Sequence, residues 1–230
     1  MGEHVEFPNN GSTGLGYLAE PDGGAAGTVG ILVLQEWWGL VDQIMRTCDR
    51  FAAAGFTALA PDLYKGRAVP LTEPDEAAKE MMALEMGETA LNLSGAVDEL
   101  LRRTGKTTIG AVGFCMGGGL ALVLACQRPD AVAAVVPAYG VIPWPDARPD
   151  YSNMRAAVLG HVAELDGAFS PEAARALESE LVGLGRDASF LVYPGVDHAF
   201  FNEDRPEVYD SAAAELLWDR TVAFLRAQLA

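Results

Sequence analysis

Residues 108–119 form the stretch TIGAVGFCMGGG, which indicates a strand followed by a turn and a helix. Its first part, Thr108–Val112, has the composition of a short strand buried on both faces of a parallel sheet. The strand ends in GFCMGGG, which has the spacing of a strand–turn–helix elbow with a nucleophile between two glycines. Side chains two positions before and after the nucleophile would collide with neighbouring backbone. Gly113 and Gly117 remove those collisions.

Cys115 occupies the nucleophile position of this elbow. At the start of a helix, the partial positive charge of the N-terminus favours the thiolate form of a cysteine. The alternative interpretation is a buried cysteine followed by a glycine-rich turn that allows close helix packing. A phosphate-binding loop is disfavoured, because the P-loop lysine and the dinucleotide fingerprint are both missing.

Strands and helices alternate along the chain on both sides of the elbow. Strands are predicted at 14–20, 29–34, 57–60, 131–137, 156–160 and 190–193, and helices at 43–54, 74–103 with an interruption near 87, 117–126, 171–184 and 206–229. This alternation predicts an α/β fold, with a mostly parallel twisted sheet and helices on both faces. A length of 230 residues fits a single domain, residues 1–230.

Two later strands are each followed by a residue that can complete the chemistry of Cys115. In hydrolases of this topology the chain order is nucleophile, acid, histidine. Asp166 and His198 follow successive predicted strands, so they are expected at the same sheet edge as Cys115. We therefore predict a catalytic triad of these three residues, with Glu164 as the rival acid. His161 precedes the acid and is predicted to pack or to line the pocket.

The segment QEWWGL, residues 35–40, follows an early strand. Hydrolases of this topology take one oxyanion-hole N–H from the residue after the nucleophile, here Met116, and another from this early loop. Glu36 lies in the loop and has two interpretations. It is either a solvated acid or a carboxylate that takes part in the chemistry.

The composition excludes several classes of function. The chain has 16 Lys and Arg against 32 Asp and Glu, a formal net charge of −16. This balance disfavours binding to nucleic acid and to an anionic membrane surface. Three widely spaced cysteines without a CxxC pair argue against a disulfide framework and a finger-type zinc site, and they fit a reducing compartment. Neither a signal peptide nor a membrane span is recognisable, so we expect a cytoplasmic protein.

Taken together, these features resemble the dienelactone hydrolase family, a cysteine branch of the α/β-hydrolase fold. The resemblance covers nearly the whole chain and rests on the following segments: Gln35–Gly39, Pro61–Tyr64, Gly113–Gly118, Asp166 and Gly195–Phe200. It implies the same triad, Cys115, Asp166 and His198. It also implies hydrolysis of small lactones such as 4-carboxymethylenebut-2-en-4-olide.

The resemblance implies roles for residues around the triad as well. Glu36 would pair with the resting thiol and help its deprotonation when substrate binds. The N–H groups of Trp37 and Met116 would form the oxyanion hole. Apart from the resemblance, the candidates for an apolar pocket around the substrate are Trp37, Tyr64, Trp144 and Phe200, and the alternative for each of these aromatic side chains is a place in the core.

The chain departs from the family in the cations that hold a substrate carboxylate. One of the two family arginines lies four residues after the catalytic histidine, where this chain has Asn202. For the other, the region after Tyr64 offers Lys65 and Arg67. Arg67 and Arg205 are the candidate substitutes. Without a cation, the net charge of −16 disfavours an anionic substrate, and we expect a neutral ester, lactone or thioester.

The expected function is therefore acyl transfer from a small-molecule ester or lactone. We expect no cofactor or metal, and a monomer or small homo-oligomer. Two alternatives stay open. A non-catalytic binding protein on the same fold would be stabilised by a small ligand without turning it over. A thiol redox role would need a resolving cysteine, and none lies near Cys115 in the sequence.

Overall fold

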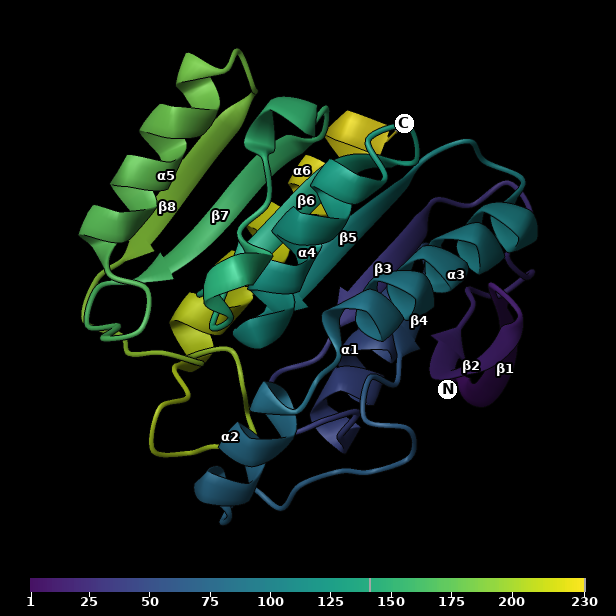
Figure 1. Cartoon of the computed structure of the whole chain (residues 1–230), viewed down its shortest axis with the longest axis horizontal. Helices are drawn as coiled ribbons and strands as arrows, with labels where there is room; N and C mark the ends of the chain where they lie inside the picture. Colours follow the sequence, from purple (N-terminus) through teal and green to yellow (C-terminus); the bar gives the residue numbers. More distant parts are fainter. Residues whose placement is uncertain (141, 230) are drawn as a thin grey trace.

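The strands form one sheet in the order β1-β2-β4-β3-β5-β6-β7-β8 in the computed structural model, which describes residues 1–140 and 142–229 (Figure 1). The strands are β1 (Glu3–Asn9), β2 (Ser12–Ala19), β3 (Gly30–Leu34), β4 (Thr57–Pro61), β5 (Ile109–Phe114), β6 (Val132–Ala138), β7 (Ala157–Ala163) and β8 (Ala188–Tyr193). The β1–β2 and β2–β4 pairs are antiparallel, and the remaining pairs are parallel. The predicted mostly parallel α/β sheet is confirmed.

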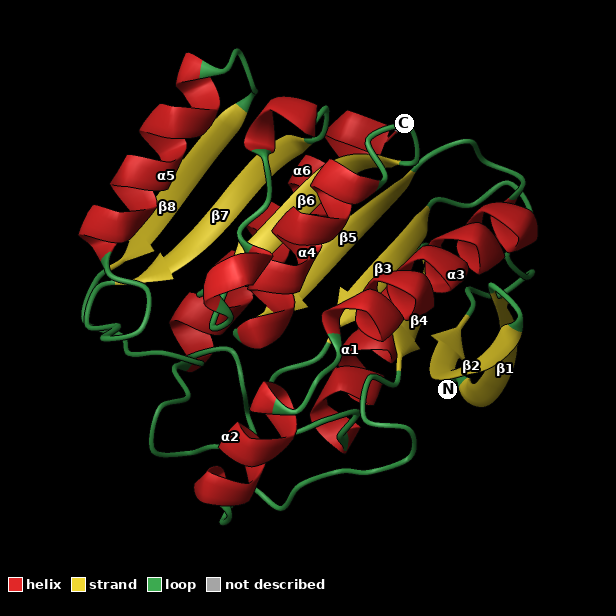
Figure 2. Cartoon of the chain, in the orientation of Figure 1, coloured by secondary structure: helices red, strands yellow, loops and turns green. Residues whose placement is uncertain are grey.

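Helices cover both faces of this sheet (Figure 2). They are α1 (Asp42–Ala53), α2 (Pro74–Met82), α3 (Met86–Thr104), α4 (Met116–Gln127), α5 (Pro171–Gly183) and α6 (Ser211–Leu229). On one face, α1 and α6 pack together through Phe51 and Trp218, whose rings are 4.6 Å apart. The helices α3, α4 and α5 lie on the other face, and α2 lies beyond the carboxyl ends of the strands. Ligands of open α/β sheets bind at that edge.

The interruption predicted near residue 87 is the break between α2 and α3. Most other boundaries differ from the prediction by one or two residues, and two of them differ by more. The last helix was expected from residue 206 and begins at Ser211. The side chain of Asp210 accepts the N–H of Ala213 at 2.8 Å, so Asp210 caps the helix and residues 206–208 form a turn. The strand predicted at 156–160 continues as β7 to Ala163.

This longer strand places His161 inside the sheet. Its ring nitrogens lie 2.8 Å from the Tyr193 hydroxyl and 3.0 Å from the Thr221 hydroxyl. Burial, together with the charge of Arg220, lowers the pKa of His161 to about 3. This histidine is therefore neutral and links β7, β8 and α6. Of the two roles predicted for His161, packing and lining the pocket, the structure shows packing.

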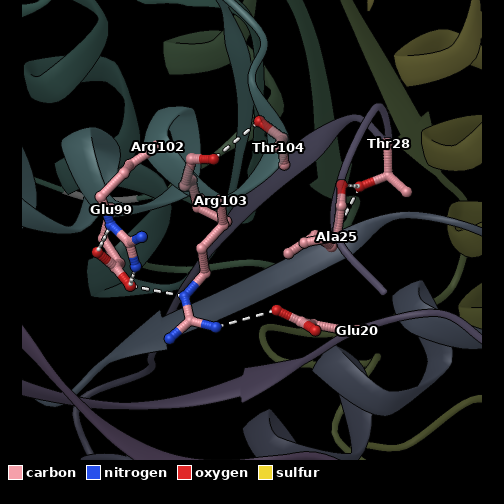
Figure 3. Close-up of polar contacts among 9 residues, drawn as sticks. Glu20, Ala25, Thr28, Glu99, Arg102, Arg103 and Thr104 are labelled. Atoms are coloured by element: carbon pink, nitrogen blue, oxygen red, sulfur yellow. Dashed lines mark hydrogen bonds and ion pairs between the residues drawn. The ribbon is translucent and has the colours of Figure 1, made fainter. Parts of the chain in front are cut away.

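A network of charged side chains ties the end of α3 to the end of β2 (Figure 3). Glu99 accepts hydrogen bonds from Arg102 at 2.7 Å and from Arg103 at 2.6 Å. Arg103 also donates to Glu20 at 3.0 Å. Burial acts to raise the pKa of Glu99, but the two arginines lower it overall. Because α3 ends just before β5 begins, this network lies toward the amino end of β5, away from the elbow.

Candidate active site

The elbow between β5 and α4 has the strained geometry that its glycines predict. Cys115 has φ 53° and ψ −120°, a conformation that residues other than glycine rarely adopt. A Cβ on Gly113 would lie 2.0 Å from the carbonyl oxygen of Gly117. A Cβ on Gly117 would lie 2.4 Å from the carbonyl oxygen of Leu34. The Cys115 N–H donates to the Ala138 carbonyl at 3.0 Å, which fixes the turn against the end of β6.

His198 and Asp166 meet at the same edge of the sheet. The Nδ1 atom of His198 lies 2.8 Å from Oδ2 of Asp166. Burial acts to lower the pKa of His198, but the bond to Asp166 and the neighbouring Cys115 raise it to about 10. The structure thus brings together the three residues that the sequence predicted as a triad, with the imidazole between carboxylate and thiol.

The Asp166 carboxylate is held by two backbone donors as well as by His198. Its Oδ1 accepts the N–H groups of Ala168 at 2.8 Å and Phe169 at 2.9 Å. Burial acts to raise the pKa of Asp166, but its bond to the histidine and the two backbone donors lower it overall. The rival acid, Glu164, instead accepts the N–H of Gly195 at 2.8 Å. Asp166, and not Glu164, is therefore the carboxylate on the histidine.

Glu36 is buried beside this group. Its Oε2 accepts from Nδ2 of Asn202 at 2.9 Å, and its Oε1 accepts from the Tyr139 hydroxyl at 3.3 Å. Burial raises the pKa of Glu36, while Asn202, His198, Arg205 and Tyr139 act in the opposite direction. With 2% of its surface exposed, Glu36 is no solvated loop acid.

Two of the predicted aromatic residues enclose the elbow. The Tyr64 hydroxyl donates to the Trp37 carbonyl at 3.0 Å and lies 3.8 Å from the sulfur of Met116. Burial, Glu80 and Cys115 raise the pKa of Tyr64. These contacts join the early loop to the first residue of α4. The two predicted oxyanion-hole residues, Trp37 and Met116, are therefore bridged by one side chain.

The other two aromatic candidates lie in different surroundings. The Trp144 indole donates to the Met81 carbonyl at 3.1 Å, so it fastens the segment after β6 to α2. Phe200 is fully buried, with its ring 5.6 Å from that of Tyr139 and 5.0 Å from that of Tyr193. The structure therefore places Phe200 in the core beneath the site.

The two candidate cations have carboxylate partners. Arg67 is paired with Glu76 and Glu80 of α2. Arg205 donates to Glu207 at 2.8 Å, and its guanidinium lies 5.9 Å from the ring of Trp38. Arg205 is close enough to Glu36 for its charge to oppose the rise that burial causes in the pKa of that carboxyl. Arg67 is part of the attachment of α2, whereas Arg205 lies near the site.

Two residues of the site were not predicted to act in it. Tyr139 directly follows β6, and its ring lies 5.1 Å from that of His198. The rule that identified the triad, which inspects the ends of parallel strands, applies to Tyr139 as well. Asn202 was noted only as a departure from the family, and no local sequence pattern indicates its bond to Glu36.

The described part of the chain holds neither a candidate metal centre nor a candidate membrane-spanning helix. Within residues 1–140 and 142–229, no three His, Cys, Asp or Glu side chains gather as they would around a metal ion. Over the same residues, no helix combines the length and apolar character needed to cross a membrane.

Comparison with known proteins places this geometry in a family. The model of the Dienelactone hydrolase family matches residues 15–229. "Protein usf" of Aquifex pyrophilus is 37% identical over 100% of both chains. A "Putative carboxymethylenebutenolidase" of Aquifex aeolicus is 35% identical, again over 100% of both.

Solved structures show the same fold. A dienelactone hydrolase-like promiscuous phosphotriesterase from metagenomic libraries superposes with a TM-score of 0.85 at 19% identity, covering 99% of this chain and 98% of the other. The resemblance expected from the motifs is thereby confirmed over nearly the whole sequence. The chain is a carboxymethylenebutenolidase-like hydrolase and belongs to the dienelactone hydrolase family.

Proposed function

We propose that this hydrolase cleaves small carboxylic esters or lactones by acyl transfer to Cys115. The observation that carries the proposal is the position of His198, which is bonded to Asp166 through Nδ1 at 2.8 Å and influenced by the thiol. Because Nδ1 faces the carboxylate, the second ring nitrogen, Nε2, is the one available to the thiol. A nucleophile, a base and an orienting acid that contact one another in this order are the arrangement that covalent acyl transfer requires.

The first half of the reaction forms a thioester. The proton of Cys115 passes to Nε2 of His198, whose raised pKa of about 10 makes it a strong enough base to hold that proton, and the resulting thiolate attacks the carbonyl carbon. The N–H groups of Trp37 and Met116 stabilise the negative charge that develops on the carbonyl oxygen. The ester C–O bond then breaks, and the leaving oxygen takes the proton from His198. Asp166 stabilises the charged imidazolium in between.

The second half of the reaction restores the thiol. His198 accepts a proton from a water molecule, whose oxygen attacks the thioester carbonyl. The C–S bond breaks, the sulfur recovers the proton from His198, and the carboxylic acid leaves. Glu36 acts in the first half of the cycle by helping the resting thiol to lose its proton once substrate is bound.

Trapping the thioester tests this mechanism. A His198→Gln variant lacks the base of both half-reactions, but p-nitrophenyl acetate is an activated ester whose leaving group departs without a proton. We therefore expect Cys115 to be acetylated slowly and the acetyl group to persist, because no base activates water for deacylation. Acid quenching, digestion and mass spectrometry locate the adduct. The peptide with Cys126, which is 8% exposed, is the internal control. An adduct on another residue would overturn the proposal. Binding without any adduct or turnover would favour the alternative of a ligand-binding protein.

We further propose that the substrate is uncharged. Arg67 is engaged by two glutamates, Asn202 gives its amide to Glu36, and Arg205 is paired with Glu207. These three candidates for holding a substrate carboxylate thus have partners already. The net charge of −16 adds a repulsive field for anions.

A matched pair of esters tests the charge preference. We expect kcat/KM for p-nitrophenyl butyrate to exceed that for p-nitrophenyl hemisuccinate by about 10-fold or more at low salt. Added salt should narrow the gap, since it screens the field. A preference for the hemisuccinate would contradict the proposal. If Arg205→Gln then removed that preference, Arg205 would be the carboxylate anchor.

A further inference from the structure

Tyr139 is a buried residue in a strained backbone conformation between two groups of the proposed mechanism. It directly follows β6, has no exposed surface and has φ 39°. Its N–H donates to the His161 carbonyl at 2.7 Å. A positive φ in a tyrosine is strained, and it persists only where the surroundings fix it.

The Tyr139 side chain touches both the base and the buried acid. Its hydroxyl donates to Oε1 of Glu36 at 3.3 Å, and the edge of its ring packs against His198 at 5.1 Å. Burial raises the pKa of Tyr139 well above its usual value, as do the nearby Glu36 and Cys115. The hydroxyl therefore keeps its proton and remains a donor at neutral pH.

Asn202 supplies a second donor to the other oxygen of Glu36. Its Nδ2 donates to Oε2 at 2.9 Å, and both residues are almost completely buried. The side-chain oxygen Oδ1 of Asn202 accepts the N–H of Asp204 at 3.1 Å, which orients the side-chain amide with its NH₂ group toward the carboxylate. An ionised carboxylate only accepts hydrogen bonds, so a donor on each oxygen matches the charged form of Glu36.

We propose that Tyr139 and Asn202 are positioning residues, which fix the Glu36 carboxylate beside His198 and act on the Cys115 reaction through it. The inference rests on the proposed function, because it adds two residues to the thiol chemistry suggested above. The titratable and charged groups that face Glu36 are His198 and Arg205, from the segment after β8, and Tyr139 itself. Cys115 is also close enough to Tyr139 to raise the pKa of its hydroxyl.

Tyr139→Phe separates this role from packing. The substitution keeps the ring but removes a donor that lowers the pKa of Glu36, so that pKa rises. Glu36 acts only when ionised, and its contribution is lost as pH falls through its pKa. We therefore expect the acid limb of kcat/KM for p-nitrophenyl acetate to move to higher pH, by about one unit.

A double-mutant comparison decides whether Tyr139 acts through Glu36. In a Glu36→Gln background, Tyr139→Phe should leave the acid limb unchanged and add no further loss of kcat. Independent, additive losses would overturn the inference. If Cys115→Ala retained turnover, the proposed function itself would fail. Additive losses together with an inactive Cys115→Ala variant would refute the role of Tyr139 and leave the proposed function intact.

Tyr193→Phe is the matched control. It removes another buried tyrosine hydroxyl, the one that lies 2.8 Å from the ring of His161. We expect a lower melting temperature and an unchanged acid limb. An equal shift of the acid limb in Tyr193→Phe would show that general loosening of the core explains the result, and it would contradict the proposal.

Discussion

Cys115→Ala is expected to lower the turnover of p-nitrophenyl acetate by about 10⁴-fold or more, because no other group can form the acyl intermediate. The variant should stay folded. Alanine is smaller than cysteine, and the strained turn depends on Gly113 and Gly117 and on the bond from the Cys115 N–H to the Ala138 carbonyl. These features involve backbone atoms only, so the substitution of the Cys115 side chain leaves them in place. Steady-state kinetics and a thermal melt measure the two outcomes.

Cys126→Ala is the matched control for the loss of a thiol. Cys126 lies in α4 and is buried to a similar degree as Cys115, since the two residues are 8% and 7% exposed. Burial raises the pKa of Cys126 to about 11, so its thiol is protonated and unreactive. We expect turnover to remain within about 3-fold of wild type, as for a core substitution remote from the chemistry. Loss of activity in Cys126→Ala with retention in Cys115→Ala would reverse the assignment.

The residues predicted from the sequence are those whose placement follows from chain order. Cys115, Asp166 and His198 each lie within five residues of the end of a parallel strand, and parallel strands bring their carboxyl ends to one edge. Recognising the strands was therefore enough to bring the three residues together. The need for glycine at 113 is equally local, because a Cβ there would meet Gly117, whereas Gly117 is required by the carbonyl oxygen of Leu34 at the end of β3.

The rest of the site depends on contacts between distant segments. Tyr139 and Glu36 are 103 residues apart in the chain, and Asn202 and Glu36 are 166 apart. A single tyrosine or asparagine has no periodicity that reveals such a partner. The pairing of Arg67 with α2 escaped prediction for the same reason. Its partners, Glu76 and Glu80, look like the exposed face of an ordinary helix.

Asp166→Asn is expected to reduce kcat by about 10³–10⁴-fold while leaving the fold intact. The reason lies in the contacts of the two carboxylate oxygens. Oδ1 accepts the N–H groups of Ala168 and Phe169, and Oδ2 accepts from Nδ1 of His198. In the variant the amide oxygen stays with the two backbone donors, so the amide NH₂ group turns toward His198.

An NH₂ group facing Nδ1 favours the wrong tautomer of His198. Nδ1 must then accept, the imidazole proton moves to Nε2, and Nε2 can no longer take the proton of the thiol. The variant also loses the charge that raises the pKa of the histidine, so the pH profile should change together with kcat. The bonds to Ala168 and Phe169 survive, and the melting temperature should fall by only a few degrees.

Glu164→Gln tests the rival acid in the same assay. Glu164 binds the N–H of Gly195 through one oxygen, and the amide oxygen of glutamine can accept the same hydrogen bond. Turnover should therefore stay within about 3-fold of wild type, since no charge on His198 changes. If Glu164→Gln were inactive and Asp166→Asn active, Glu164 would be the orienting acid. The hydrogen bond between Asp166 and His198 would then have only a structural role.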